Sequence, residues 1–191
     1  PAIRDGLPWS WHSYGEYLDA VVEMRPSLNM AGLVGHSAVR YYAMGDAACD
    51  EEAHPNPEQL AMMADLVGHA VADGAVGFST SRLLGHKIPD GRCVPGTHAS
   101  IDEYEAILQS VVKAGGGMFQ AVFEPTNMKH EMQIARRAAA LGCQVLFNGG
   151  ANKREQSDNW RKTFENIEAS GGKIASVGQV RASGCLMGLG G

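Results

Sequence analysis

Several features that would assign this 191-residue chain to a familiar class are missing from it. No apolar run approaches the roughly 20 residues that a membrane-spanning helix needs, and the N-terminus does not resemble a signal peptide. Lysine and arginine form no basic stripe, and the formal net charge of -5 gives no reason to expect a nucleic-acid partner. We therefore expect a protein that binds neither membranes nor nucleic acid.

Cysteines are few and widely separated. The four residues include no Cys-x-x-Cys pair: Cys49, Cys93, Cys143 and Cys185. This spacing disfavours a zinc ribbon or a redox-active pair. Scattered thiols are typical of reduced cysteines in a cytoplasmic protein, so the sequence predicts that location.

Self-sufficient catalytic motifs are also absent. The seven histidines form neither His-x-His nor His-Glu-x-x-His, although a zinc ion needs three or four ligands held together. The chain has no Gly-x-Ser-x-Gly nucleophile turn and no Gly-x-x-x-x-Gly-Lys phosphate loop. The residues therefore predict no metal site that this chain would form by itself.

What the sequence does contain is an alternation of short apolar runs and segments with helical periodicity. The predicted strands are 30–34, 75–79, 118–123, 144–147 and 174–180. The predicted helices are 13–24, 57–73, 100–114, 131–141 and 158–169. The strands are almost continuously apolar, which indicates a parallel sheet covered by helices. The 24 glycines suit the many turns of such a fold.

Two closures of this sheet are possible from the residues alone. One is an open, doubly wound sheet, and the other is part of a (β/α)8 barrel, since a whole barrel needs eight strands and about 250 residues. Two helix starts are more specific. Asn56 before Pro57 predicts an N-cap, and Ser100 with Glu103 predicts a reciprocal capping box.

Candidate functional residues follow from the architecture, because parallel α/β folds gather functional groups at the carboxyl ends of their strands. Seven candidates for substrate binding lie at or just beyond four of the predicted strands: His36, Ser79, Ser81, Arg82, His86, Gln120 and Asn148. Gln179 and Arg181 hold the same position after the fifth strand.

Each candidate has a plainer interpretation. A single histidine after a strand, such as His36, is more often a hydrogen-bonded structural residue than a ligand. Ser79 and Ser81 could cap a turn, whereas Arg82 is suited to hold a carboxylate through two hydrogen bonds. The long loop 84–97, which carries His86, is either a lid over substrate or an insertion without a role.

Several stretches of the chain occur in an order that is more specific than any one of them. They are the tryptophan-rich 11–19, 33–40 followed by Met44-Gly45, 74–82, 94–97, and 178–180 followed by 186–189. Together these stretches resemble the N-acyl-D-amino-acid deacylase (D-aminoacylase-like) family of the amidohydrolase superfamily. The resemblance runs over nearly the whole chain.

The resemblance implies a metal-dependent hydrolase that acts on non-peptide C–N bonds and is built on a (β/α)8 TIM-type barrel. One or two zinc ions would activate water against an amide or cyclic amide carbonyl, and N-acyl-D-amino acids are the best-known substrates. Residues 1–191 would be the central portion of that barrel, with about five parallel strands and flanking helices.

The same resemblance implies that most of the catalytic apparatus lies outside this chain. The family's His-x-His, its metal-binding cysteine and its proton-shuttling aspartate have no counterpart here. Two further metal-binding histidines of the deacylases would fall near Gln120 and Asn148, whose amides are poor zinc ligands. We therefore expect that the chain alone is inactive and binds no zinc, and that the parent enzyme uses a reduced metal site or a different amide.

Two other functions stay open. The chain could be a small non-catalytic α/β domain that binds a ligand or a protein, or an intact α/β enzyme with a site around His36, Arg82 and His86. An incomplete barrel would leave sheet edges and apolar faces unpaired, so we expect self-association or a missing partner segment. The full-length parent would take a small-molecule amide as its substrate.

Overall fold

The computed structural model describes residues 9–148 and 154–177, which form one parallel sheet with helices on it. The strands are β1 (Leu33–Gly35), β2 (Gly77–Ser81), β3 (Met118–Val122), β4 (Gln144–Asn148) and β5 (Lys173–Val177). The α-helices are α2 (Tyr14–Glu23), α3 (His36–Met44), α4 (Pro57–Ala72), α5 (Ile101–Lys113), α6 (Met128–Ala140) and α7 (Arg154–Ala169). Two short 3-10 helices follow α3 and β3: η1 (Gly45–Cys49) and η2 (Pro125–Asn127).

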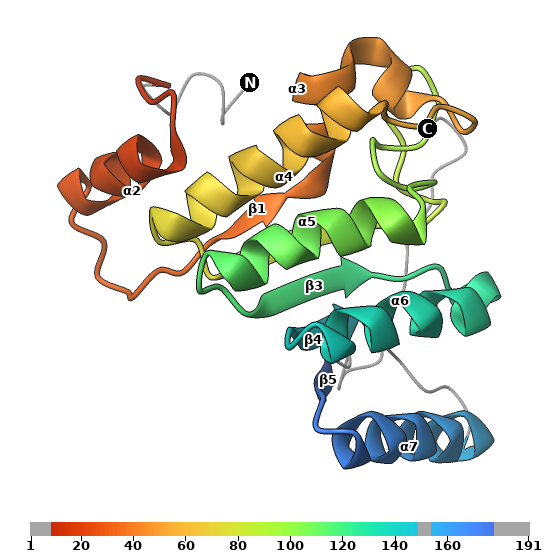
Figure 1. Cartoon of the computed structure of the whole chain (residues 1–191). Helices are drawn as coiled ribbons and strands as arrows, with labels where there is room; N and C mark the ends of the chain where they lie inside the picture. The colour runs from red at the N-terminus through yellow and green to blue at the C-terminus, as the bar shows by residue number, and fades with distance from the viewer. Residues whose placement is uncertain (1–8, 149–153, 178–191) are drawn as a thin grey trace, which may run out of the picture.

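The order of the strands distinguishes between the two possible closures. Across the sheet it is β1-β2-β3-β4-β5, the order of the chain, with every neighbouring pair parallel. A doubly wound sheet reverses its strand order at a switch point and has helices on both faces. Here α4, α5, α6 and α7 lie on one face (Figure 1). The predicted α/β fold with five parallel strands is confirmed, and its sequential order fits a partial TIM-type barrel.

Capping residues determine where α4 and α5 begin, and one predicted capping contact is wrong. Asn56 caps α4 in a reciprocal box with Gln59, and Pro57 is its first residue, as predicted. Ser100 caps α5 by accepting the main-chain N–H of Glu103 at 3.2 Å. The predicted return contact from the Glu103 side chain is wrong, because this carboxylate turns inward to His36.

The helix α3 was not predicted. It follows the three-residue strand β1 directly, and its N-cap Gly35 provides no side-chain hydrogen bond that could announce it. The second strand also begins two residues later than predicted, at Gly77. A Cβ atom at Gly77 would lie 1.9 Å from the main-chain oxygen of Met118, so the close approach of β2 and β3 requires glycine there.

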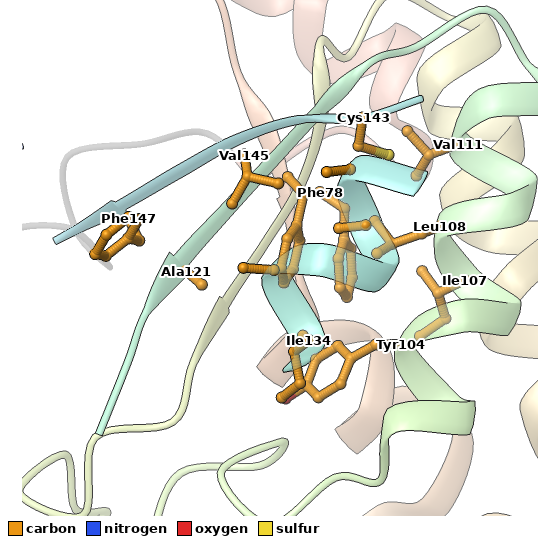
Figure 2. Close-up of a cluster of buried hydrophobic side chains, with 14 of the residues drawn as sticks. Phe78, Tyr104, Ile107, Leu108, Val111, Ala121, Ile134, Cys143, Val145 and Phe147 are labelled. Carbon is orange, nitrogen blue, oxygen red and sulfur yellow. The ribbon is translucent and has the colours of Figure 1, made fainter. Parts of the chain in front are cut away.

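The hydrophobic core lies between the helices and one face of the sheet, called here the covered face. Phe78, Phe119, Val145 and Ile174 form one row across β2 to β5, and all are buried. Figure 2 shows this cluster, in which α5 and α6 contribute apolar side chains opposite the strands. Burying a side chain of this size contributes about 1.5–3 kcal/mol, so this layer dominates the stability of the fold.

Alternate residues of the same strands point to the opposite face, called here the open face. Its middle row is Ser79, Gln120, Leu146 and Ala175, none of which is buried. No helix in the described parts of the chain covers this face (Figure 1). The sheet therefore has an apolar face against helices and a mixed face that the described residues leave accessible.

Two further expectations concern membranes and cysteines. None of the helices in 9–148 and 154–177 is long and apolar enough to cross a membrane. Cys49, Cys93 and Cys143 are free thiols, as expected for scattered cysteines. Cys185 lies outside the described residues, as do Gln179 and Arg181.

Candidate functional site at the carboxyl ends of the strands

Five of the seven candidates lie at or beyond the carboxyl ends of the strands, as predicted, whereas Ser79 and Gln120 are the middle residues of β2 and β3. The seven also separate onto the two faces of the sheet. The open-face group is Ser79, Ser81, Gln120 and Asn148, with His86 contributed by the following loop. The other two, His36 and Arg82, are buried on the covered side. The separation follows from the two-residue repeat of a strand, because Ser79 and Ser81 share one face and Thr80 lies on the other.

On the open face, the closest contact joins Ser81 to His86. The Ser81 Oγ lies 2.6 Å from His86 Nδ1. Ser79 is the register partner of Gln120, and its hydroxyl donates to the Val34 carbonyl at 3.4 Å. The Gln120 side-chain amide makes no hydrogen bond to another described residue, so this face offers an unused donor and acceptor beside the serines.

The loop 84–97 that carries His86 is folded rather than extended. An antiparallel bridge joins Lys87 to Cys93 within it. At one base of the loop, the Leu84 N–H donates to Glu124 Oε2 at 2.9 Å. At the other base, the Ser37 hydroxyl donates to the Pro95 carbonyl at 2.8 Å. These contacts hold His86 over the end of β2, while a role as a lid stays a prediction.

The tip of this loop is also tied to the body of the protein. Arg92 pairs with Asp46 at 2.9 Å, with Asp50 at 3.3 Å and with its neighbour Asp90 at 2.8 Å. These hydrogen bonds and the charge of the guanidinium hold the pKa values of Asp46 and Asp90 below their usual range. All of these groups are solvent-accessible, so salt screens the attachment.

His36 belongs to a buried network on the covered side. Its Nδ1 lies 3.0 Å from Thr80 Oγ1, and its Nε2 lies 2.8 Å from Glu103 Oε1. Arg40, one turn further along α3, donates its Nε to the same Glu103 oxygen at 3.0 Å. Both ring nitrogens of His36 are therefore engaged by the protein itself.

The charges in this network follow from its burial. Burial lowers the pKa of His36 because it disfavours the imidazolium. Burial also opposes ionisation of Glu103, but the hydrogen bonds from His36 and Arg40 and the positive charge of Arg40 hold the pKa of this carboxyl below its usual value. Because Arg40 supplies the balancing positive charge, we assign His36 as neutral, donating from Nε2 and accepting from Thr80 at Nδ1.

Arg82 has its carboxylate partner within the chain. Its Nε contacts both carboxylate oxygens of Glu131 on α6, at 2.8 and 3.0 Å, and its Nη1 donates to the Ala99 carbonyl at 2.9 Å. The guanidinium also lies 5.6 Å from the centre of the Tyr104 ring. Burial raises the pKa of Glu131 in spite of Arg82, but the short contacts are those of an ion pair. In this structure Arg82 ties β2 to α5 and α6.

Three charged residues of these networks escaped the sequence reasoning: Arg40, Glu103 and Glu131. Arg40 follows His36 by four residues, a spacing that places both on one side of a helix. That signal becomes visible once α3 is recognised. Glu103 and Glu131 occupy first turns of helices, where an acidic residue is usually explained by the helix dipole.

The described residues do not supply a zinc site by themselves. Within 9–148 and 154–177, no group of three or more His, Cys, Asp or Glu side chains is placed to hold a metal ion. At the open face, His86 is accompanied by hydroxyls and by the amides of Gln120 and Asn148. Amide oxygens suit hard cations better than zinc, so the donor set here does not fit that metal.

The sequence of the chain is similar to those of several known proteins. The chain is 41% identical over 171 residues to an N-acyl-D-glutamate deacylase of Alcaligenes xylosoxydans xylosoxydans, an alignment that covers 88% of this chain and 30% of that protein. It is 38% identical over 117 residues to a D-aminoacylase of the same organism, covering 60% of this chain and 21% of the relative.

The chain is similar to deacylases. It is also 31% identical over 132 residues to an uncharacterized protein of Mycobacterium tuberculosis, covering 66% of this chain and 21% of that protein. The chain thus spans between 21% and 30% of the length of these curated relatives. No protein-family model matches the chain, and no solved structure matches it. The resemblance to deacylases, predicted from the motifs, is confirmed to this extent.

Proposed function

We propose that residues 1–191 are the central portion of the catalytic barrel of a metal-dependent hydrolase that acts on C–N bonds of the N-acyl-D-amino-acid type. The observation that carries the proposal is the alignment with an N-acyl-D-glutamate deacylase over 88% of this chain. The sequential parallel sheet supports it, because enzymes built on such sheets place their active sites at the carboxyl ends of the strands.

The open face would serve the substrate of this reaction, a small amide. The hydroxyl of Ser79 and the amides of Gln120 and Asn148 would bind the polar groups of an N-acyl amino acid and orient its amide carbonyl. His36 and Arg82 would support the site without contacting the substrate, since their hydrogen bonds join β2 to α5 and α6. In this assignment the open face of the sheet binds the substrate, and the residues of the covered face support it.

A zinc ion would supply water activation and carbonyl polarisation in such an enzyme. Because the donor set of the described residues does not fit zinc, we propose that ligands from elsewhere in a longer protein hold the metal. The 191-residue chain by itself would then bind no zinc and hydrolyse no amide. The free thiols of Cys49, Cys93 and Cys143 support a cytoplasmic location as part of the same proposal.

The open face also implies a partner. Leu146 and Val122 lie on it among the polar side chains, and neither is buried. A sheet that leaves apolar residues and strand edges accessible tends to associate. We propose that a further segment of the parent, or a second copy of the chain, packs against an edge strand and the apolar part of this face and leaves the carboxyl ends of the strands open to substrate. Light scattering on the purified chain measures the second alternative.

The test compares the chain with the longest coding sequence that contains it. Both proteins are incubated with N-acetyl-D-glutamate, N-acetyl-D-leucine and their L enantiomers, with and without added zinc, and the released amino acid is measured. The expected result is zinc-dependent release of a D-amino acid by the longer protein and none by the 191-residue chain. Gln120→Ala should reduce that release, and Ser157→Ala, an exposed change on α7, should not.

Two outcomes would contradict the proposal. Hydrolysis by the longer protein that ignores both configuration and zinc would rule out this reaction type. A coding sequence that begins and ends with this chain, together with no hydrolysis, would favour a small non-catalytic α/β domain that binds a ligand or a protein.

A further inference from the structure

We propose that Ser81 and His86 form a nucleophile–base pair that accepts acyl groups at the open face of the sheet. The inference goes beyond amide hydrolysis by the parent enzyme, because it concerns two residues of this chain and requires no metal ion. Its substrates would be small activated acyl compounds, such as aryl esters, that reach the surface at the end of β2.

The first argument is the distance between the two reacting atoms. The Ser81 Oγ lies 2.6 Å from His86 Nδ1, within the range of a serine activated by an adjacent base. When Nε2 carries the ring proton, the Nδ1 lone pair faces the hydroxyl and accepts its hydrogen. The imidazole is then placed to remove the hydroxyl proton as Oγ attacks a carbonyl.

The second argument is that both residues are held in place. Ser81 is the last residue of β2, which pairs with β1 on one side and β3 on the other. His86 donates its main-chain N–H to the Leu83 carbonyl at 2.9 Å, and its own carbonyl accepts the Val94 N–H at 3.1 Å. Main-chain hydrogen bonds therefore hold the backbone on both sides of the pair, which keeps the two side chains within reach of each other.

The third argument is access, together with a neighbouring donor. Ser81 is half-buried and His86 is exposed, so an acyl compound can approach the hydroxyl from the open face. Gln120, on the adjacent strand and the same face, pairs with Ser79 and so lies diagonally from Ser81. Its side-chain amide makes no hydrogen bond within the described structure, so it is a free donor on the face from which the acyl compound would approach.

The two histidines near β2 differ in this respect. His36 also contacts a hydroxyl, that of Thr80, at 3.0 Å, but its side chain is fully buried and its second nitrogen contacts Glu103. No acyl compound can reach it. Accessibility therefore selects the Ser81–His86 pair as the reactive one.

The reaction has two steps, acylation of Ser81 and hydrolysis of the resulting ester. In the first, Oγ bonds to the acyl carbon, its proton moves to His86 Nδ1, and the bond to the leaving group breaks as that group takes the proton from the imidazole. In the second, water attacks the Ser81 ester, gives one proton to His86, and releases the acid while Oγ recovers the proton.

The experiment uses the purified 191-residue chain and an alkyl fluorophosphonate carrying a fluorescent reporter. Peptide mass mapping should place the adduct on Ser81, with one equivalent bound per chain. Ser81→Ala should remove the adduct, and His86→Gln should slow labelling by about 100-fold or more, the scale of general-base assistance. Ser157→Ala, on the exposed surface of α7, is the matched control and should label at the native rate.

Circular dichroism of each variant excludes unfolding as the cause of a lost adduct. An adduct on another residue, no adduct on the folded native chain, or equal labelling of the native chain and His86→Gln would each overturn the proposal. Because the probe needs neither zinc nor the remainder of a longer protein, failure of deacylase activity leaves this result unaffected. Failure of labelling likewise leaves the deacylase proposal standing.

Discussion

The two faces of the sheet carry side chains from the same strands, but these side chains are buried on one face and accessible on the other. On the covered face, His36 and Arg82 are buried and their polar groups are used by the protein. On the open face, Gln120 remains unpaired within the described structure, and Ser81 and His86 contact each other at an accessible surface. The position of a residue at a strand end is therefore insufficient to assign it a role, because the face to which it points decides whether a substrate can reach it.

The buried networks also show what the covered face requires. A charge removed from water must be paired and hydrogen-bonded, or it destabilises the fold. Glu103 satisfies this condition with one oxygen, which serves both His36 and Arg40, whereas its Oε2 has no hydrogen-bond partner in the structure. The polar side chains of the open face carry no such requirement and are free for another task.

The largest expected difference between the faces comes from two adjacent residues of β3. Phe119→Ala, in the core, should lower the free energy of unfolding by about 3–5 kcal/mol. Gln120→Ala, on the open face, should change it by about 0.5 kcal/mol or less. Urea unfolding followed by circular dichroism measures both. Equal losses would show that a partner closes the open face as tightly as the helices close the other.

A second pair of variants compares a buried with an accessible acid on α5. Glu103→Ala leaves Arg40 buried without its carboxylate, which should cost about 3–5 kcal/mol. Glu105→Ala removes only a 3.7 Å contact with the solvent-exposed Arg137 and should cost about 1 kcal/mol or less. A Glu103 variant as stable as the Glu105 variant would mean that the network contributes nothing to the fold.

Two glycines of the loop 84–97 allow the cost of backbone strain to be measured separately from the cost of a steric contact with His36. Gly96 and Gly91 have φ angles of +96° and +94°, so alanine is strained at both, by about 1–2 kcal/mol. A Cβ at Gly96 would also lie 2.4 Å from His36 Nδ1, whereas nothing lies within 4 Å of one at Gly91. Gly96→Ala should therefore lower the free energy of unfolding by about 1–3 kcal/mol more than Gly91→Ala does. Chemical unfolding of both variants measures this difference. A smaller loss at Gly96 would show that the His36 ring moves aside at little cost.

The smallest effect concerns pH. Burial lowers the pKa of His36 in the folded chain below its ordinary value of 6.5. At a pH just below 6.5, the unfolded chain therefore binds a proton at this residue that the folded chain does not bind. Stability should fall as the pH drops through this range, with a slope of at most about 1.4 kcal/mol per pH unit from this residue. In His36→Gln the slope should be shallower. The stabilising ionisation of Glu103 is lost at lower pH, below its ordinary 4.5, since its folded pKa is lowered. Urea midpoints measured at several pH values test this, and identical slopes would contradict a buried neutral His36.

Much of the fold could be predicted, and the reasons are local. The apolar runs located five strands, and Asn56 with Pro57 located the start of α4, because caps and periodicity depend on residues a few positions apart. The helix α3 was missed because it follows β1 without a turn or a capping side chain. The inward turn of Glu103 was missed because its first-turn position offered a local explanation that was sufficient but wrong.

The sequence by itself determined the α/β class, the five parallel strands and the edge of the sheet where candidate residues gather. Only the tertiary structure decided which of those residues are buried and which are accessible. The contacts of His36 join residues 44 and 67 positions away, and those of Arg82 reach 49 positions to Glu131. Each strand sends alternate side chains to both faces, and no local pattern states which face the helices will cover. That choice depends on packing between distant segments, and it separates the supporting residues of this protein from those that can meet a substrate.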